Sequence, residues 1–396
     1  MNIFQYCRKL IEKSRVQAGY LSFRRIDIFL LIAALAVLIF IAIRQPLKTI
    51  EKHNRIDITI SSRCGDLFGR DIVNTLIHEF EESNPDLHVR ETDSNNADIV
   101  FFDDGEYSSL VSDSVLASLA YYEYTGNRAG QWALPLALFM DIFVYNIDIL
   151  KTAHCDRPPK TRAEFIAAAR AVSGINAAAS GHKPVYAFAL GLSADDPAAL
   201  RRDFYPWVWA NGGEIRAESS LSGAAADVIA FLGQLNHEGL LAPHSFEKTG
   251  AHRLGEFANG NIAMMTASAR DIAFLQKNAH GVTFDITTVP VITRDKNHLG
   301  LSGIYAGMSS ACTMPDKAWL FLTFFAGKNN ILAEVLGAVP GCYPGVFTGD
   351  YIAQNPLYSK AWDIFEAADI VDHEPGQPHE EAVNRLIREK LAEAFR

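Results

Sequence analysis

From residue 55 onward, hydrophobic and polar residues recur first with the spacing of a strand and then with the spacing of a helix. Residues 55–61, RIDITIS, alternate polar and apolar side chains as a half-buried strand does. Residues 71–82 carry apolar side chains at helical spacing, and Asn84-Pro85 ends that helix. Residues 87–91 and 98–102 predict two further strands. The order strand, helix, strand, strand predicts an α/β lobe with a mainly parallel sheet.

Residues 132–146, WALPLALFMDIFVYN, form the longest strand pattern after residue 55. An apolar strand enters a polar spot at Met140 and Asp141 and leaves as a second apolar strand. Thr161 and Glu164 predict a capping box for a helix that runs to Val172.

Further strands and helices follow with ordinary start and stop signals. Strands are predicted at residues 185–190 and 284–291, and helices at residues 200–211 and 224–239. Gly212-Gly213 ends the helix at 200–211, and Pro290 marks a second crossing between two lobes.

Residues 28–43 are an unbroken apolar run with Arg24 and Arg25 before it and Arg44 after it. The run is apolar on every face, unlike a surface helix, and its length is close to what a bilayer requires. No small-residue cleavage site follows, so an uncleaved signal anchor is favoured over a cleaved signal peptide. The excess of Lys and Arg before the run predicts that residues 1–25 are cytoplasmic.

Composition narrows the class of protein. The chain has 396 residues, enough for two lobes, with 49% hydrophobic and 21% charged residues. The net charge is -10, and no basic stripe is interleaved with aromatic residues, which argues against nucleic acid as a partner. The five cysteines include no C-x-x-C, so zinc and redox roles lack the required spacing and unpaired or buried thiols are favoured.

Several segments resemble the carbohydrate-type solute-binding proteins of ABC transporters, a family similar to maltose-binding protein. The segments are FEESNPDLHV with ADIVFFDD, the strand 132–146, RRDFYPWVWANGGEI, GEFANGNIAM, and DKAWLF after LSGIYAGM. The chain departs from the family at Ile147 and Arg162, where Lys and Trp are usual, and in TASARD, which lacks a Trp. The resemblance covers residues 55–396. It implies a two-lobed α/β clamp of the type II periplasmic-binding-protein kind, with an added N-terminal transmembrane anchor.

The resemblance also implies ligand contacts. The first set lies in loops after strands and on the crossing strand, and it comprises Arg63, Asp66, Asp103, Asp104, Met140 and Asp141. The second set lies in the second half of the chain and comprises Asp203, Phe204, Trp207, Ser268, Arg270, Ser302 and Gly303. Carboxylates and guanidinium groups would bind hydroxyl groups, and aromatic rings would cover a sugar face. The alternatives are capping or turn roles for Asp66 and Asp104, and core packing for the aromatic residues, favoured for Trp209.

The implied organisation follows the chain in order. Residues 1–25 are a cytoplasmic segment, 26–45 the transmembrane signal anchor and 46–54 a linker. Residues 55–141 and 290–326 form lobe 1, and residues 142–289 and 327–396 form lobe 2.

The expected function is capture of a sugar or related polar solute between the lobes and delivery to the permease of an ABC importer. The protein would be a monomer, single-pass in the cytoplasmic membrane, with its binding lobes in the periplasm or outside the cell. No catalytic residue, metal or cofactor is expected. The alternatives are a ligand sensor that does not feed a transporter and an anchored glycoside hydrolase, although no G-x-S-x-G, H-E-x-x-H or S-x-x-K with its companions is present.

Overall fold

The described part of the chain folds around one long strand that two groups of strands share. The computed structural model describes residues 55–92, 97–122, 131–178, 184–215, 221, 223–293, 298–328, 355–371 and 380–396. The predicted anchor at 26–45 and its flanking segments 1–25 and 46–54 lie outside these residues. None of the helices in these ranges is both long and apolar enough to cross a membrane.

The strands are β1 (Ile56–Ser61), β2 (Leu87–Thr92), β3 (Ile99–Asp103), β4 (Leu134–Asn146), β5 (Tyr186–Phe188), β6 (Ile262–Ser268), β7 (Phe284–Thr287), β8 (His298–Leu299), β9 (Leu301–Met308) and β10 (Asp369–Ile370). The helices are α3 (Arg63–Phe68), α4 (Arg70–Ser83), α5 (Asp104–Ser112), α6 (Ile147–Thr152), α7 (Arg162–Ala178), α8 (Ala199–Asp203), α9 (Tyr205–Trp209), α10 (Gly223–His237), α11 (Gly250–Ala258), α12 (Ala269–Asn278), α13 (Pro315–Ala326), α16 (Pro356–Glu366) and α17 (Glu380–Ala394).

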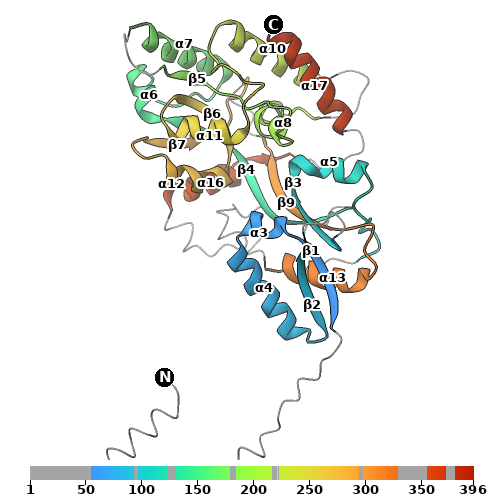
Figure 1. Cartoon of the computed structure of the whole chain (residues 1–396). Coiled ribbons are helices and arrows are strands. Elements are labelled where there is room, and N and C mark those ends of the chain that lie inside the picture. The colour runs from blue at the N-terminus through green and yellow to red at the C-terminus, as the bar shows by residue number, and fades with distance from the viewer. Residues whose placement is uncertain are drawn as a thin grey trace, which may run out of the picture. The chain divides into compact units, whose positions relative to one another are not determined.

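The strand β4 joins the two lobes (Figure 1). The sheet order is β2-β1-β3-β9-β4-β6-β5, with β7 also paired to β4. The first half of β4 pairs with β9 up to Met140, and the second half pairs with β6 and β7 from Asp141 onward. The partners of β4 therefore change at the predicted polar spot. We call the part around β1, β2, β3 and β9 the first lobe, and the part around β5, β6 and β7 the second lobe.

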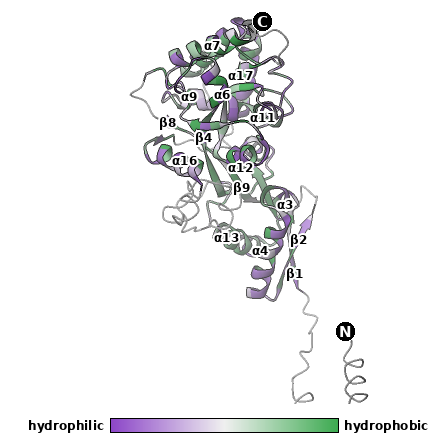
Figure 2. Cartoon of the chain, turned by 90° about the vertical axis from the view of Figure 1, so that its left-hand side faces the viewer, coloured by the Kyte–Doolittle hydropathy of each residue, from purple (hydrophilic) through white to green (hydrophobic). Residues whose placement is uncertain are grey.

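The first lobe is a sheet with helices on both faces. The strand β1 pairs in parallel with β2 and β3, as the sequence predicts, whereas β9 runs antiparallel to β3. Aromatic rings of α4 and α13 meet on one face, where Phe80 lies 5.0 Å from Phe321 between ring centroids. On the other face, Tyr107 of α5 packs against Phe102 and Tyr305. The strand β4, which joins the lobes, is largely hydrophobic (Figure 2).

Local signals account for most element bounds. Thr161 and Glu164 form the predicted capping box, because each side chain bonds the other residue's backbone N–H. Gly260 adopts a φ of 74°, which lets α11 turn into β6. Arg63 and Asp66, expected in a loop after a strand, lie instead in α3, where Cys64, Leu67 and Phe68 are buried.

The helix expected at 200–211 is two short helices, α8 and α9. Pro206 has no N–H to donate to the carbonyl of Arg202, and its ring crowds that carbonyl, so the first helix cannot continue. The strand expected at 284–291 ends at Thr287, and Val291 still pairs with Thr161 in the second lobe. Cys64, Cys155 and Cys312 are unpaired thiols, and Cys342 lies outside the described residues.

Candidate functional site

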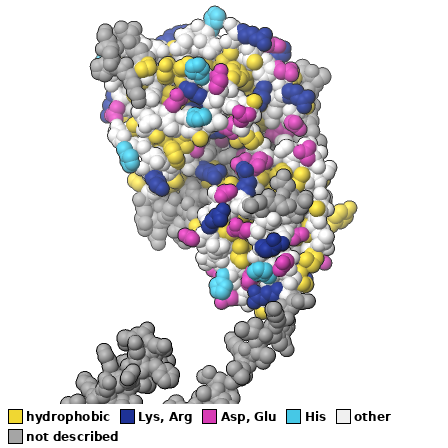
Figure 3. Space-filling model, in the orientation of Figure 1, with side chains coloured by type: hydrophobic (Ala, Val, Ile, Leu, Met, Phe, Trp, Pro, Cys, Tyr) yellow, Lys and Arg dark blue, Asp and Glu magenta, His cyan; other side chains and the backbone are white. Residues whose placement is uncertain are grey.

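A cavity of about 420 Å³ lies between the two lobes. Its walls come from the ends of β3 and β9, the middle of β4, the helix α8 and the junction of β6 with α12. The predicted contacts that line it are Asp103, Asp104, Asp141, Ser268, Arg270, Ser302 and Gly303. Figure 3 shows side chains of both charge signs gathered across the middle of the molecule, between the lobes. That these residues contact a ligand stays a prediction.

The first-lobe wall begins where β3 becomes α5. Asp103 is the N-cap of α5, and its Oδ1 accepts a hydrogen bond of 3.1 Å from the Gly105 N–H. The next residue, Asp104, is buried, and its Oδ2 accepts a hydrogen bond of 2.8 Å from the Gly303 N–H. This bond ties the start of α5 to β9 and holds the Asp104 carboxyl at the cavity.

The crossing strand supplies the floor. Phe139 and Asp141 are two residues apart on β4, so their side chains leave the strand on the same face. Both line the cavity, whereas Met140 points the other way and is fully buried in the core. Backbone bonds hold Asp141 in place, since its N–H donates to the Gly300 carbonyl at 3.0 Å. A Cβ at Gly300 would lie 2.5 Å from Asp141 Oδ2, so only glycine fits there.

The second-lobe wall contributes Arg201, which the sequence did not single out. Its Nη1 donates to both carboxylate oxygens of Asp141 at 3.1 and 3.2 Å. Its Nε lies 3.7 Å from Asp104 Oδ2, so the same guanidinium bridges the crossing strand and the first lobe. The guanidinium also lies over the Trp209 ring at 4.2 Å. The sequence does carry a signal for this residue, since Arg201-Arg202 come just before the aromatic residues at 204–209. The prediction chose Phe204 and Trp207 as ligand contacts instead.

This ionic cluster, Asp104, Asp141 and Arg201, is not internally satisfied. The Nε and Nη2 atoms of Arg201 and the Oδ1 of Asp104 are buried and have no hydrogen-bond partner. The side chains of Arg201 and Asp104 are only 8% and 7% exposed. An unpartnered buried polar group costs on the order of 1–3 kcal/mol, more when charged. A solute with hydroxyl or charged groups would supply the missing partners.

Burial shifts the protonation of both carboxyl groups. Burial raises the pKa of Asp104 to about 7, although Arg201 and the Gly303 N–H act to lower it. Burial likewise raises the pKa of Asp141 to about 6 against the opposing effect of Arg201. One guanidinium therefore does not fully offset the desolvation of two carboxylates.

The junction of β6 and α12 closes the cavity from the second lobe. Ser268 lies directly opposite Asp141 in the sheet. Its N–H donates to Asp271 Oδ2 at 2.9 Å, which starts α12. Arg270 follows, with its guanidinium 5.8 Å from the centroid of the Phe139 ring.

The two lobes also touch beside the cavity. A Cβ at Gly105 of α5 would lie 2.6 Å from the Ala198 nitrogen before α8. Ser108 Oγ donates to Glu380 Oε2 of α17 at 2.8 Å. Ser112 of α5 also donates to Glu381 of α17 at 3.5 Å, so α5 contacts the second lobe along its length.

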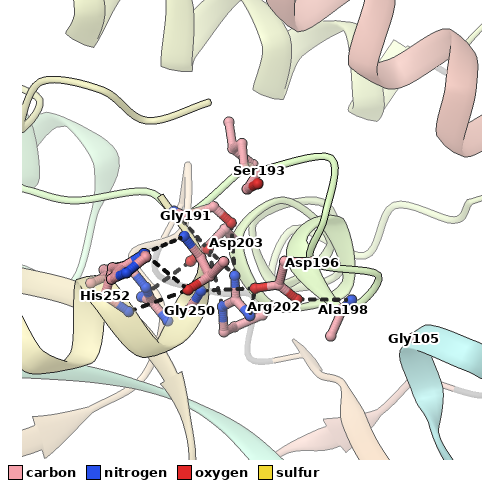
Figure 4. Close-up of polar contacts among 12 residues, drawn as sticks. Gly105, Gly191, Ser193, Asp196, Ala198, Arg202, Asp203, Gly250 and His252 are labelled. Atoms are coloured by element: carbon pink, nitrogen blue, oxygen red, sulfur yellow. Dashed lines mark hydrogen bonds and ion pairs between the residues drawn. The ribbon is translucent and has the colours of Figure 1, made fainter. Parts of the chain in front are cut away.

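Asp203 belongs to a separate buried cluster next to the cavity. Arg202 donates to Asp196 at 2.9 Å and to Asp203 at 3.0 Å, and Arg253 Nη1 lies 3.1 Å from Asp203 Oδ1. Figure 4 shows Arg202 between the two carboxylates, with Gly191 and Gly250 beside it. Asp203 is fully buried and does not line the cavity. Besides the two arginines, it accepts hydrogen bonds from the Thr266 hydroxyl at 2.8 Å and from the Gly191 N–H at 3.0 Å.

The predicted aromatic contacts are core residues. Trp207 is fully buried, with its ring centroid 5.9, 5.5 and 5.6 Å from those of Phe143, Phe165 and Phe188. Phe204 is also fully buried, and neither residue lines the cavity. The break at Pro206 separates α8 from α9, so one continuous helical face does not exist there. Trp209 is 1% exposed, as the core alternative expected.

The remaining predicted contacts, Arg63 and Asp66, do not line the cavity. Arg63 pairs with Asp103 at 3.2 Å and with Glu106 at 2.5 Å, which anchors Asp103 from outside. Asp66 is exposed on α3 and caps neither α3 nor α4, whose N-caps are Ser62 and Gly69.

Comparison with protein families gives one extensive match. The family model described as "Bacterial extracellular solute-binding protein" matches residues 67–360. A search of curated protein sequences finds no match to this chain.

Solved structures share the fold at low sequence identity. A putative oligosaccharide periplasmic-binding protein from Synechococcus has a TM-score of 0.68 and 17% identity, over 85% of this chain and 93% of that one. The GacH receptor of Streptomyces glaucescens, solved unliganded and with acarbose, has a TM-score of 0.64 and 16% identity, over 86% and 92%. UgpB from Mycobacterium tuberculosis, solved with glycerophosphocholine, has a TM-score of 0.62 and 18% identity, over 86% and 98%. These likenesses support the two-lobed α/β periplasmic-binding-protein fold.

Proposed function

Since the chain belongs to the bacterial extracellular solute-binding protein family, whose members are binding proteins and not enzymes, we propose that it captures a sugar or related polar solute between its lobes. The observation that carries this proposal is the buried, incompletely bonded cluster at the cavity. Arg201 of the second lobe reaches Asp141 on the crossing strand and Asp104 of the first lobe. Its free donors and the free Asp104 oxygen lie where both lobes would grip a solute.

Capture would work by closure of the lobes. Proteins of this architecture close by a hinge, and a ligand favours the closed form only through its stronger binding to that form. Among the described residues, β4 runs from the first lobe into the second, pairing with β9 in one and with β6 and β7 in the other. A solute that supplies partners from both walls stabilises the closed arrangement.

The polar character of the cavity supports a hydroxylated solute. A hydroxyl group both donates and accepts, so it can bond Asp104 Oδ1 and Arg201 Nη2 together. The GacH receptor was solved with acarbose and UgpB with glycerophosphocholine, which are both hydroxyl-bearing. The proposal extends this class of solute to the present chain.

We also propose where the protein acts and which partner receives the solute. We place the binding lobes in the periplasm or outside the cell, tethered to the cytoplasmic membrane by the apolar run at residues 28–43. The closed lobes would deliver the solute to the permease of an ABC importer, with the protein acting as a monomer. These parts rest on the sequence pattern and the family.

A thermal-shift screen of the full chain in detergent tests the proposal. A compound that binds only the folded protein raises the melting temperature by mass action. We expect a rise with at least one sugar, polyol or sugar phosphate, with no product formed on long incubation. A flat response to all three classes would contradict the proposal, and turnover of a glycoside would favour a hydrolase.

A further inference from the structure

We propose that the solute carries an anionic group, a carboxylate or a phosphate, which Arg201 and Arg270 bind at the cavity. This inference rests on the proposed binding function and specifies the chemical class of the solute.

Most charged groups at the cavity are already bound within the protein. Arg202 donates to Asp196, Asp203 and the Gly191 carbonyl through all three of its nitrogens. The Asp271 carboxylate accepts from Ser268. These groups hold the walls together and leave little capacity for a ligand.

Arg201 keeps two free donor nitrogens. Its Nη1 bonds Asp141, whereas Nε and Nη2 are buried without a hydrogen-bond partner. The side chain is only 8% exposed, so water does not readily replace the missing acceptors. A guanidinium edge matches the geometry of two oxygens of one carboxylate or phosphate.

Arg270 is the second available cation. Among the described residues, no carboxylate forms an ion pair with it and no hydrogen bond engages it. Its guanidinium lies 5.8 Å from the Phe139 ring centroid. Phe139 is the aromatic residue in the described lining of the cavity, and the cation already faces it. Stacking of a neutral pyranose is therefore a poor account of this wall, whereas an anion would meet an unpaired positive charge.

The acidic groups on the opposite side are the main objection. The charged and titratable groups that face Asp104 are Asp103, Asp141, Arg201 and Tyr305, and Glu380 of α17 reaches α5 through Ser108. An ionised Asp104 would repel an anion. Burial already raises the pKa of Asp104 to about 7, so at neutral pH the carboxyl takes up a proton at little cost. The neutral carboxyl can then donate to the ligand from Oδ1.

This arrangement predicts the sign of a pH effect. An anion beside Asp104 raises its pKa further, so the complex holds more protons than the free protein and binding tightens as the pH falls from about 8 to about 6. A neutral sugar that donates a hydroxyl to Asp104 favours the ionised carboxylate, so its binding weakens over the same range. The two classes of solute therefore give opposite pH dependence.

Isothermal titration calorimetry on the full chain in detergent tests the inference with matched compounds. Glucose, galactose and mannose are each compared with their uronate and their 6-phosphate, so that only the group at carbon 6 changes. Binding better to the uronate identifies a carboxylate, and binding better to the 6-phosphate identifies a phosphate. We expect an acidic member of at least one series to bind roughly tenfold or more tightly than the neutral sugar.

Variants at position 270 supply the residue-level test. Arg270→Gln should weaken binding of the acidic compound by roughly 10- to 100-fold, because it removes a charged hydrogen-bond donor. Arg270→Lys keeps the charge without the planar fork and should fall between the two. Lys277→Gln is the matched control, since it removes an exposed cation from the same helix α12 and should leave affinity unchanged.

The outcomes separate this inference from the function on which it rests. If a neutral sugar binds as tightly as its acidic partners, or if Arg270→Gln leaves acid binding unchanged, the anionic solute is wrong and solute capture stands. If no compound in any series binds, both are contradicted.

Discussion

Arg201 and Arg202 are neighbours on α8, and they belong to two buried ionic clusters with opposite properties. Arg202 bonds Asp196, Asp203 and the Gly191 carbonyl, and none of its nitrogens lacks a partner. Arg201 bonds only Asp141 and leaves two buried nitrogens without partners. The guanidinium of Arg202 is therefore fully bonded, whereas that of Arg201 is not.

The difference separates structure from binding. The cluster of Arg202, Asp203 and Arg253 joins α8, α11 and β6 within the second lobe and holds one wall of the cavity. The cluster of Arg201, Asp141 and Asp104 joins residues of both lobes. An open cluster between lobes costs stability when no ligand is bound, and a ligand that completes it gains that energy on binding. The Nε of Arg253 is also buried without a hydrogen-bond partner, but Arg253 and Asp203 do not line the cavity, so a ligand there cannot supply that partner.

The largest expected effect comes from breaking the buried cluster of Arg202, Asp203 and Arg253. Asp203→Ala leaves Arg202 and Arg253 buried without their shared carboxylate, and we expect a loss of about 3–5 kcal/mol in the free energy of unfolding. Urea unfolding followed by circular dichroism measures this loss. Asp195→Ala removes an exposed carboxylate from the preceding loop and should change stability by less than about 0.5 kcal/mol. Equal stability of the two variants would mean that the buried cluster does not support the lobe.

The next largest effect on stability comes from Asp104 in the cluster with Asp141 and Arg201, and it depends on pH. The folded pKa of Asp104 is raised to about 7 from an ordinary 3.8, so the unfolded chain ionises first as the pH rises. Folded wild-type protein should therefore lose about 2–4 kcal/mol relative to Asp104→Asn between pH 4 and pH 7, and little more above pH 7.

Thermal or urea unfolding of both proteins at several pH values measures that difference. Asp113→Asn, which removes an exposed carboxyl at the end of α5, should follow the wild type. A constant difference between wild type and Asp104→Asn across this range would show that Asp104 does not carry the raised pKa.

A smaller effect is expected where the lobes touch outside the cluster. Ser108→Ala removes the hydroxyl that donates to Glu380 across the lobes, so the closed form should lose about 0.5–1.5 kcal/mol. Solute affinity, measured by calorimetry, should fall several-fold at most. Ser109→Ala is the control because its hydroxyl bonds only the Glu106 carbonyl within α5. A loss of affinity as large as that of a variant in the cavity would mean that the contact between α5 and α17 contributes most to holding the lobes closed.

The sequence predicted elements whose signals are local. The apolar pattern placed β4, and the Thr161–Glu164 capping box placed the start of α7. Asp104 was singled out because it follows a strand, and the structure does bring it to the cavity.

The sequence could not divide the residues around position 203 between cavity and core. That division depends on the direction of each side chain on α8 and α9, two short helices that Pro206 separates. On α8, Arg201 points toward Asp141, whereas its neighbour Arg202 points toward Asp196 and Asp203. On α9, Trp207 packs in the aromatic core. A pattern of aromatic residues at helical spacing suits a core as well as a sugar site, so only three-dimensional neighbours decide.

The most direct test of the account is the thermal shift of Arg201→Met beside the wild type, against the same neutral and acidic sugars. Methionine keeps much of the packing on Trp209 but removes the unpartnered donors of Arg201, a residue that lines the cavity. We expect the compound that raises the wild-type melting temperature to have little or no effect on Arg201→Met, while Lys277→Gln behaves as wild type. An equal rise in Arg201→Met would contradict the claim that the open cluster between the lobes binds the solute.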